Sequence, residues 1–164
     1  LYDDEAFLEK IAEHFGRDII ENGSLNRRKL ADKVFSDKKE LQILNSMVHP
    51  EVVKRFYEWA EKQHSPYVIM ESAILFENSL QDCFDTIISI STPEEVVLQR
   101  VMLRDDCNKE QVLQRIRSQM PQEEKNTLAD YVILHDNMTM LLPQILSIHG
   151  DILKHCIKNE KRKN

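Results

Sequence analysis

Residues 85–134 decide the fold, and they read DTIISISTPEEVVLQRVMLRDDCNKEQVLQRIRSQMPQEEKNTLADYVIL. Both ends of this stretch are short apolar runs with β-branched residues, at 86–90 and 131–134. Such runs are typical of strands that are buried on both faces of a parallel sheet. Between the runs the apolar residues recur about every 3.6 positions, which predicts helices. The stretch therefore predicts an α/β fold in which a helical segment connects two buried parallel strands.

The residues that start and stop helices divide this helical segment. Residues 92–95, TPEE, predict a helix start with the threonine as cap, the proline in the first position and the second glutamate completing a capping box. Asn108 is predicted to cap a second helix over 109–119. Pro121 is predicted to end that helix, and 122–126 to be a polar connection.

Basic side chains collect in the same segment: Arg100, Arg104, Arg115, Arg117 and Lys125. Arg100 and Arg104 are spaced i, i+4, so both guanidiniums are expected on one helix face, where they could bind phosphate oxygens. The alternative is that nearby acids neutralise them; the candidates are Asp105, Asp106 and either Glu95 or Glu110. An Arg-rich helical insertion between buried strands looks like the lid that closes over phosphates in α/β nucleotide kinases.

Residues 1–64 carry helical patterns only. A helix is expected over 3–15 with a stop at Gly16, and another from a cap at Asn26 through Phe35. A third is expected from Ser36 and Asp37 through Met47. Pro50 is expected to interrupt it, because the residue before a proline avoids the α region, and to start a further helix.

Three positions of this helical region are candidate ligand contacts. Arg27 and Arg28 lie in the first turn of a predicted helix, where cations oppose the helix dipole. They are either solvated or meet an anionic substrate. His49, at the predicted break, is either a buried hydrogen-bonding residue or a substrate contact.

Strands are expected only beyond residue 64. Residues 67–70 are predicted to form a short strand that ends at Glu71. Ligands of open α/β sheets gather at the carboxyl ends of strands, so Glu71 is a candidate metal-shell or base residue, with capping of the next turn as the alternative. From Thr139 onward, apolar residues at helical spacing predict a long core-facing helix and a solvated tail over 158–164.

Composition excludes several classes of protein. The 164 residues are 41% hydrophobic and 30% charged, the balance of a soluble protein of one ordinary domain's size. The net charge of −6 argues against nucleic-acid binding, and no apolar run reaches the roughly 20 residues of a membrane span. The three cysteines lack a C-x-x-C pair, which favours reduced thiols in the cytoplasm.

The glycine count is more informative. Gly16, Gly23 and Gly150 cannot form a G-x-x-x-x-G-K-[ST] phosphate-binding loop, and the chain begins with Leu1 rather than Met. The sequence is therefore interpreted as a fragment, with the phosphate-binding loop expected upstream of Leu1.

An ordered set of motifs resembles the dephospho-CoA kinase family over nearly the whole chain. The motifs are HFG at 14–16, NRRKL at 26–30 followed by 34–35, LNSMVHP at 44–50, ILFEN at 74–78, QRVMLRDD at 99–106, RIRSQ at 115–119 and ADYVI at 129–133. Two stretches depart from the family pattern. Residues 71–75 read ESAIL where D-x-P-L-L is common, and 135–137 read HDN where N-x-G is usual.

The resemblance implies a P-loop kinase fold: a parallel sheet with five strands in the whole protein and about three in this chain, flanked by helices. It also implies a mostly helical CoA-binding domain at 1–64 and an α/β core at 65–164 with a lid at about 92–127. The implied reaction transfers the ATP γ-phosphoryl, with Mg²⁺, to the ribose 3′-hydroxyl of dephospho-CoA. The expected partners are these two small molecules, and neither nucleic acid nor a membrane. The catalytic acid and the P-loop would lie outside this chain, which alone is expected to be inactive.

By the same resemblance, the candidate site residues fall into three groups. Arg104 and Lys125 are candidates for the ATP phosphates, with Glu71 as a further catalytic candidate. Arg27, Arg28 and His49 are candidates for dephospho-CoA, and Asn137 for the adenine-side loop. Two alternatives stay open: another nucleotide or nucleoside kinase of the same fold, and a non-catalytic binding domain.

Overall fold

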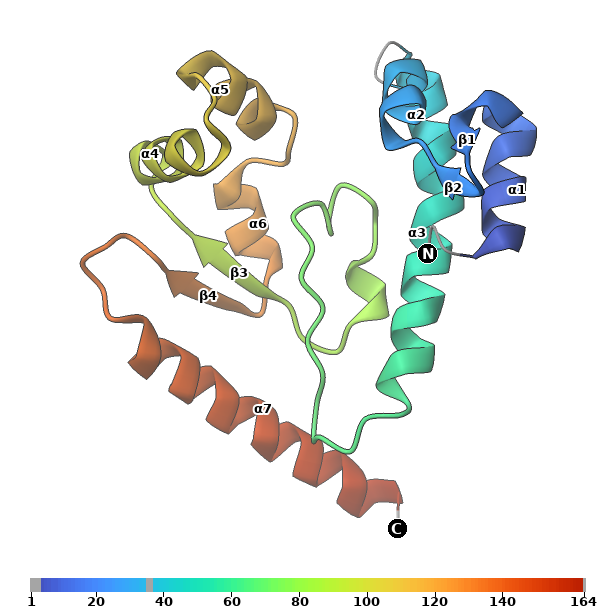
Figure 1. Ribbon diagram of the computed structural model, residues 1–164. Helices are drawn as coiled ribbons and strands as arrows, with labels where there is room; N and C mark the ends of the chain where they lie inside the picture. Colours follow the sequence, from blue (N-terminus) through green and yellow to red (C-terminus); the bar gives the residue numbers. More distant parts are fainter. Residues whose placement is uncertain (1–3, 35–36, 164) are drawn as a thin grey trace. The chain divides into compact units, whose positions relative to one another are not determined.

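Two parallel strands, β3 (Ile88–Ser91) and β4 (Tyr131–Leu134), form the sheet predicted from residues 85–134 (Figure 1). They pair in register from Ile88 opposite Tyr131 to Ser91 opposite Leu134. Three helices connect them: α4 (Glu94–Asp105), α5 (Lys109–Arg117) and α6 (Gln122–Leu128). The chain is therefore an α/β protein with a helix-flanked parallel sheet, as predicted.

The computed structural model describes residues 4–34 and 37–163. The chain divides into two compact units, Leu1–Gln63 and His64–Asn164, which we call the first unit and the sheet unit. The predicted Phe35 and Ser36 helix ends, and the start of the first helix at Asp3, lie outside the described residues.

The first unit has an apolar core of its own. Its elements are α1 (Glu5–Phe15), the 3-10 helix η1 (Arg17–Ile19), β1 (Ile20–Glu21), β2 (Ser24–Leu25), α2 (Arg27–Val34) and α3 (Lys38–Ala60). The buried core side chains come from α1, η1 and α2: Phe7, Ile11, Ala12, Phe15, Ile19, Leu30 and Val34. Burial of this apolar set is the main stabilising contribution to the unit.

A short hairpin in the first unit corrects the expectation that residues 1–64 are only helical. Strands β1 and β2 pair antiparallel through Ile20–Leu25 and Glu21–Ser24. Asn22 and Gly23 turn between them with φ of 52° and 74°, the left-handed region that a two-residue hairpin turn requires. The Asn-Gly turn was predicted, but its flanking residues are too few to show a strand pattern.

Helix α3 runs through Pro50 without a break, so the predicted interruption is wrong. A proline in a helix interior costs roughly 3 kcal/mol, since it removes one backbone hydrogen bond and crowds the preceding turn. Packing of the preceding turns offsets this cost, because Leu41, Leu44, Met47 and Val48 lie against the core of the first unit. Beyond the proline, Arg55 forms ion pairs with Glu51 and with Asp4, the N-cap of α1.

The helices of the crossover also differ in detail from the sequence prediction. Pro93 is extended (φ −56°, ψ 138°), so α4 begins at Glu94, one residue late for a threonine capping box. The predicted polar connection at 122–126 is instead part of α6, which begins directly after Pro121. Two glutamates in the first turn of α6 favour this helix through the helix dipole.

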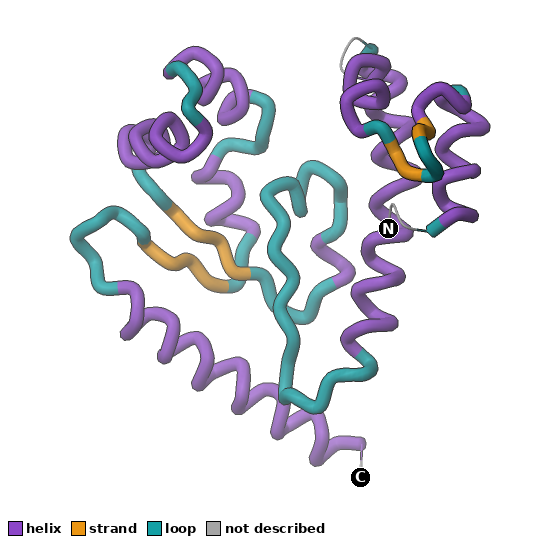
Figure 2. Tube along the Cα trace, viewed as in Figure 1, coloured by secondary structure: helices purple, strands orange, loops and turns teal. Residues whose placement is uncertain are grey.

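The strand predicted at 67–70 is not formed in the described part of the chain. The segment has no regular secondary structure, because a strand needs a hydrogen-bonded neighbour and no described residue pairs with its backbone as a ladder. Its contacts are made by side chains instead: Tyr67 Oη lies 2.6 Å from His149 Nδ1 on α7 (Leu141–Lys163). Figure 2 shows that the chain between α3 and β3 is mostly loop, although it includes the 3-10 helix η2 (Gln81–Cys83).

Helix α7 buries only part of the apolar face that the sequence predicts for it. It begins at Leu141 rather than Thr139, because Asp136 accepts hydrogen bonds from the backbone N–H groups of residues 138 and 139 and holds a turn there. Ile148 is buried, but Leu142, Ile145 and Ile157 are exposed. The helix also continues to Lys163 through the predicted tail. On α4, Leu98 is the buried side chain and Leu103 is 88% exposed.

Candidate functional site

Asp105, at the end of α4, joins two arginines of the predicted lid. Its carboxylate accepts from Arg104 Nε at 2.7 Å and from Arg115 Nη1 on α5 at 2.6 Å. Both arginines remain open to solvent, with side chains 74% and 58% exposed, whereas Asp105 is 25% exposed. Of the acids that could neutralise Arg104, Asp105 is the one that pairs with it. The Arg104 guanidinium nevertheless remains accessible to solvent.

Two cations on one carboxylate leave the cluster with a net positive charge. The hydrogen bonds from Arg104 and then Arg115 lower the pKa of Asp105 from 3.8 to about 2, so it is ionised at neutral pH. A guanidinium binds phosphate through paired N–H donors, and the second guanidinium of the cluster supplies additional positive charge. The cluster can therefore receive an anionic group such as a phosphate.

Arg100 does not join this cluster, which corrects the expectation that it shares a phosphate-facing surface with Arg104. Its guanidinium binds Asn137 Oδ1 and lies 3.0 Å from His135 Nδ1. Because a guanidinium only donates, His135 Nδ1 is the acceptor, which places the ring proton on Nε2. Arg100 therefore fixes the loop after β4, in which Asn137 has a left-handed backbone (φ 67°).

A cavity of about 340 Å³ lies where β3 and β4 end, within the sheet unit. Its wall includes Thr92, Asn126 and three carboxylate side chains, of Glu94, Glu123 and Asp136. The position agrees with the rule that ligands gather at the carboxyl ends of parallel strands. The carboxylates would repel phosphate, so the cavity suits the hydroxyl and amino groups of a nucleoside better than a phosphate chain.

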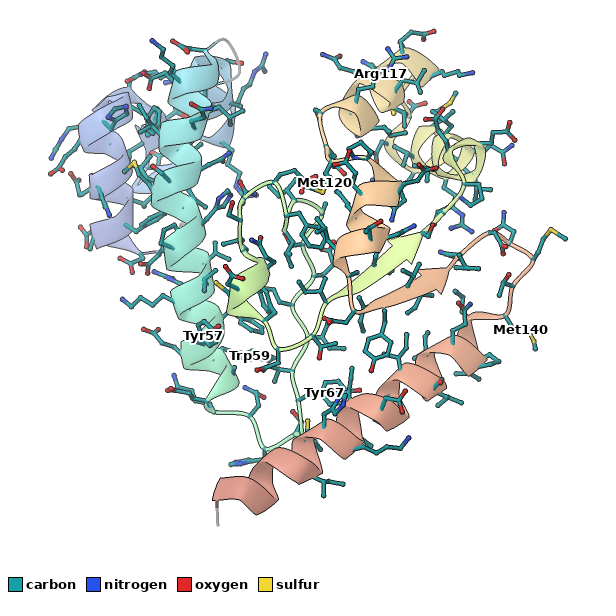
Figure 3. The ribbon with its side chains drawn as sticks, turned by 180° about the vertical axis from the view of Figure 1, so that it is seen from behind. Tyr57, Trp59, Tyr67, Arg117, Met120 and Met140 are labelled. Atoms are coloured by element: carbon teal, nitrogen blue, oxygen red, sulfur yellow. The ribbon has the colours of Figure 1, made fainter. Side chains whose placement is uncertain are left out.

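Lys125, the other lid candidate, lies on α6 and is largely buried. Its ammonium is 2.8 Å from Glu77 Oε1, 3.0 Å from the Ala73 carbonyl oxygen and 3.4 Å from Gln119 Oε1. Glu77 Oε1 also accepts from the backbone N–H of Met120 at 2.7 Å, and Figure 3 shows Met120 beside the loop that carries Glu77. Glu77 lies inside the ILFEN motif at 74–78, but its sequence position alone predicts no role for it.

The candidates in the first unit lie on two packed helices, α2 and α3. Asn26 caps α2 as predicted, since its Oδ1 accepts from the backbone N–H groups of Arg28 and Lys29. The side chains of Arg27 and Arg28 are exposed in this first turn. His49 is half-buried in the middle of α3, and burial lowers the pKa of its imidazole, which is therefore mainly neutral at pH 7. Helix α2 thus offers exposed cations, and helix α3 offers a neutral imidazole that can form a hydrogen bond.

Two candidates have little around them. Glu71 is exposed and follows the irregular segment 67–70 rather than the end of a paired strand. Within residues 4–34 and 37–163, no three His, Cys, Asp or Glu side chains are grouped so that they could hold a metal ion. The described side chains therefore do not by themselves form a Mg²⁺ site. None of the described helices combines the length and apolar character of a membrane span.

The hydrogen bonds of Asn126 to β3 could not have been predicted from the sequence. Its side chain joins α6 to β3, with Oδ1 accepting from Ser89 Oγ at 2.7 Å and Nδ2 donating to Ser91 Oγ at 3.1 Å. Gln122 donates to Ser89 Oγ at 2.9 Å. Serines at alternate strand positions facing two amides one helical turn apart are the only signal, and it becomes visible only once the strand and helix are known to be neighbours.

Comparison with known proteins assigns the family. The sequence model for dephospho-CoA kinase matches residues 2–140. The chain is 35% identical over 146 residues to a dephospho-CoA kinase of Bacteroides fragilis (strain YCH46), covering 88% of this chain and 71% of that protein. A second dephospho-CoA kinase, from Idiomarina loihiensis, is 34% identical over 156 residues, covering 94% of this chain and 77% of that protein.

A solved structure agrees with the sequence matches. TT1252 from Thermus thermophilus has a TM-score of 0.68 and 30% identity, covering 97% of this chain and 81% of that chain. The likeness therefore extends over both units and is one of fold as well as sequence. With a family match over most of its length and relatives of this identity, the chain belongs to the dephospho-CoA kinase family.

Proposed function

We propose that the protein containing this chain is an ATP-dependent dephospho-CoA kinase, which transfers the γ-phosphoryl of ATP to the ribose 3′-hydroxyl of dephospho-CoA. The observation that carries this proposal is the Asp105 cluster, which presents Arg104 and Arg115 to solvent at the junction of α4 and α5. Phosphoryl transfer depends mainly on positioning and on cationic groups that stabilise charge on the transferred group. Membership of the dephospho-CoA kinase family supports this reaction over a nucleoside monophosphate kinase or a non-catalytic domain.

On this proposal the two ends of ATP meet different parts of the sheet unit. Arg104 binds the phosphates, since its guanidinium is accessible and its position is fixed by Asp105. Asn137 lies on the nucleoside side, on the loop that Arg100 holds. The acidic cavity at the ends of β3 and β4 supports this division, because it favours a nucleoside over a phosphate.

Dephospho-CoA is proposed to bind the first unit. Arg27 and Arg28 provide exposed positive charge for an anionic part of this substrate, and His49 provides a hydrogen bond. Glu71 stays a lower-ranked candidate for the reacting end, supported only by its exposed position after the segment 67–70. We propose a cytoplasmic enzyme, with small molecules as ligands; the described cysteines are all free thiols.

When bound, Mg²⁺ would supply positive charge that neutralises the ATP phosphates. Since the described side chains do not group into a metal site, no step is assigned to the ion. The 164 residues also contain no G-x-x-x-x-G-K-[ST] sequence. We therefore propose that these residues alone do not catalyse the transfer.

The test compares the 164-residue chain with the product of the complete reading frame in which it lies. Each is incubated with Mg-ATP and either dephospho-CoA or AMP, and ADP formation is measured. We expect the complete product to phosphorylate dephospho-CoA and not AMP, and the 164-residue chain to be inactive. Efficient use of AMP would overturn the substrate assignment, and turnover by the 164-residue chain would overturn the need for a separate phosphate-binding loop.

A further inference from the structure

We propose that Glu77 and Lys125 are positioning residues that fix α6 to the sheet unit, and that Lys125 does not bind ATP phosphate. This inference rests on the proposed function for its catalytic consequence, because the lid matters only if a phosphoryl group is transferred. Its structural part, an internal anchor for α6, stands on the contacts of the two side chains.

The ammonium of Lys125 has no N–H left for a ligand. A lysine ammonium has three donors, and three acceptors surround this one: Glu77 Oε1, the Ala73 carbonyl and Gln119 Oε1. The side chain is only 14% exposed. A phosphate could bind here only if at least one of these hydrogen bonds broke and the ammonium moved outward. Arg104, by contrast, is 74% exposed and shares one acceptor residue.

Glu77 connects Lys125 with the residues that precede α6. Its Oε1 accepts from both Lys125 Nζ and the backbone N–H of Met120, so one carboxylate oxygen holds α6 and the residue that leads into it. Burial by itself would raise the pKa of Glu77, but the hydrogen bonds from Lys125 and from backbone N–H groups outweigh it and lower the pKa. The carboxylate is therefore ionised at neutral pH, as an ion pair with Lys125 requires.

A second set of contacts joins α6 to β3. Gln122 and Asn126 bind the hydroxyls of Ser89 and Ser91 on β3, at distances from 2.7 to 3.1 Å. Helix α6 is thus attached to β3 by amides and to the loop at 73–77 by Lys125. Arg104 and Arg115, which carry the accessible positive charge, lie outside this anchored helix, on α4 and α5.

The pair is expected to act on the start of α6. Without it, Gln119 Oε1 and the Met120 N–H each lose a partner, so the link between α5 and α6 would loosen. Arg115 would then approach the phosphates less often in the geometry that Asp105 sets, and kcat would fall. KM for ATP would change little, because no phosphate contact is removed.

The first experiment needs no substrate and reads the anchor directly. Amide hydrogen exchange over residues 118–128 is measured in the 164-residue chain for the wild type, Lys125→Met, Glu77→Gln and the charge-swapped double variant Glu77→Lys/Lys125→Glu. We expect exchange to rise about tenfold in both single variants. The double variant should recover part of the protection. Unchanged exchange in both single variants would overturn the anchor.

A matched control removes an ion pair that is not buried. Asp151 and Lys154 on α7 form such a pair at 2.8 Å, with both side chains well exposed. Lys154→Met should leave exchange over 118–128 at the wild-type level. A rise equal to that of Lys125→Met would mean that loss of any lysine loosens the unit, and the specific role of Glu77 and Lys125 would be rejected.

The second experiment separates positioning from phosphate binding in the complete reading-frame product. If Lys125 is a positioning residue, the charge-swapped double variant recovers at least part of the kcat lost in Lys125→Met, and KM for ATP stays within about threefold of wild type. If Lys125 binds phosphate, the glutamate at position 125 repels ATP and the double variant is worse than either single one. That result would overturn the inference. If neither the wild type nor any variant phosphorylates dephospho-CoA, the proposed function is wrong. The hydrogen-exchange experiment still decides whether Glu77 and Lys125 anchor α6, because it needs no substrate.

Discussion

The interactions within the first unit differ in kind from those within the sheet unit. The first unit buries a continuous apolar cluster that includes Ile11 and Ile19, both with no exposed surface. The sheet unit exposes apolar side chains of its own strands: Ile90 is 59% exposed, Val132 37% and Leu134 46%. Its buried apolar side chains include Leu98, Val112, Ile133 and Ile148, and polar side chains also join its elements. The first unit thus has a continuous apolar core, whereas in the sheet unit directional hydrogen bonds and ion pairs add to a smaller set of buried apolar side chains.

This difference has a consequence for function. Polar contacts have defined directions, so they fix the orientation of α6 and of the loop after β4 more narrowly than apolar packing would. The same contacts are sensitive to single substitutions, because removal of one partner leaves the other buried without a hydrogen bond. The proposed contacts to the phosphates and the nucleoside of ATP all lie in the sheet unit.

The largest expected effect tests the comparison itself. Ile11→Ala should lower the free energy of unfolding by about 2–5 kcal/mol, since it leaves a cavity in a closed core. Ile90→Ala, the same change on an exposed position of β3, should cost less than about 1 kcal/mol. Urea denaturation of the 164-residue chain, followed by circular dichroism, measures both. Equal losses would show that the sheet unit also has a closed core.

The second prediction concerns accessible positive charge in the sheet unit. In the complete reading-frame product, Arg104→Ala should lower kcat/KM by about 100-fold, because a phosphate loses a paired donor in the transition state. Arg104→Lys should recover only part of this, since an ammonium cannot make the planar two-point contact. Steady-state kinetics with Mg-ATP and dephospho-CoA measure both variants.

Arg117→Ala is the matched control for Arg104. Arg117 lies on α5, on the same insertion, and carries the same charge, but it is not part of the Asp105 cluster (Figure 3). Its removal should change kcat/KM by no more than about twofold. Equal losses in Arg104→Ala and Arg117→Ala would assign the effect to the overall charge of the insertion rather than to one guanidinium.

The sequence predicted the elements of the sheet unit better than their attachments. Periodicity and capping are local signals, so β4 and the Asn108 cap of α5 are found as predicted, and β3 lies within two residues of its predicted ends. The partner of Lys125 is not a local property. Glu77 and Lys125 meet only because α6 returns to the loop at 73–77, and their sequence positions carry no sign of it.

The errors in the first unit have the opposite cause. Pro50 and His49 carry a strong local signal for a helix break, and burial of the neighbouring turns overrides it. The ordered motifs identify the family correctly in spite of this error, because they do not depend on where a helix ends.

The third prediction asks whether the first unit selects the acceptor. Arg28→Ala and His49→Ala should each raise KM for dephospho-CoA roughly tenfold, the value of one lost hydrogen bond or charge contact. KM for ATP should stay nearly unchanged, because its proposed contacts lie in the other unit. Lys54→Ala, on an exposed part of α3, is the control and should affect neither KM. Equal rises for both substrates would point to a folding role for Arg28 and His49.

The smallest expected effect is a pH dependence at the Asp105 cluster. The folded-state pKa of Asp105 is about 2, below its ordinary value of 3.8, because Arg104 and Arg115 donate to its carboxylate. A carboxyl with a lowered pKa stabilises the fold at pH values above 3.8, and this contribution declines as the pH falls toward 2. The difference in unfolding free energy between wild type and Asp105→Asn should therefore be constant from pH 7 to about pH 5 and shrink toward pH 3.

Asp106→Asn provides the control for this titration. Asp106 ends α4 in the left-handed conformation (φ 48°), which asparagine tolerates well. Other carboxylates of the chain titrate in both proteins of each pair, so they cancel in the difference. Urea denaturation at pH 7, 5, 4 and 3 should give a gap that narrows for Asp105→Asn and stays near zero for Asp106→Asn. A gap for Asp105→Asn that does not change with pH would mean that the carboxylate is not held by the two guanidiniums in solution, and the cluster proposed to receive phosphate would lose its organising residue.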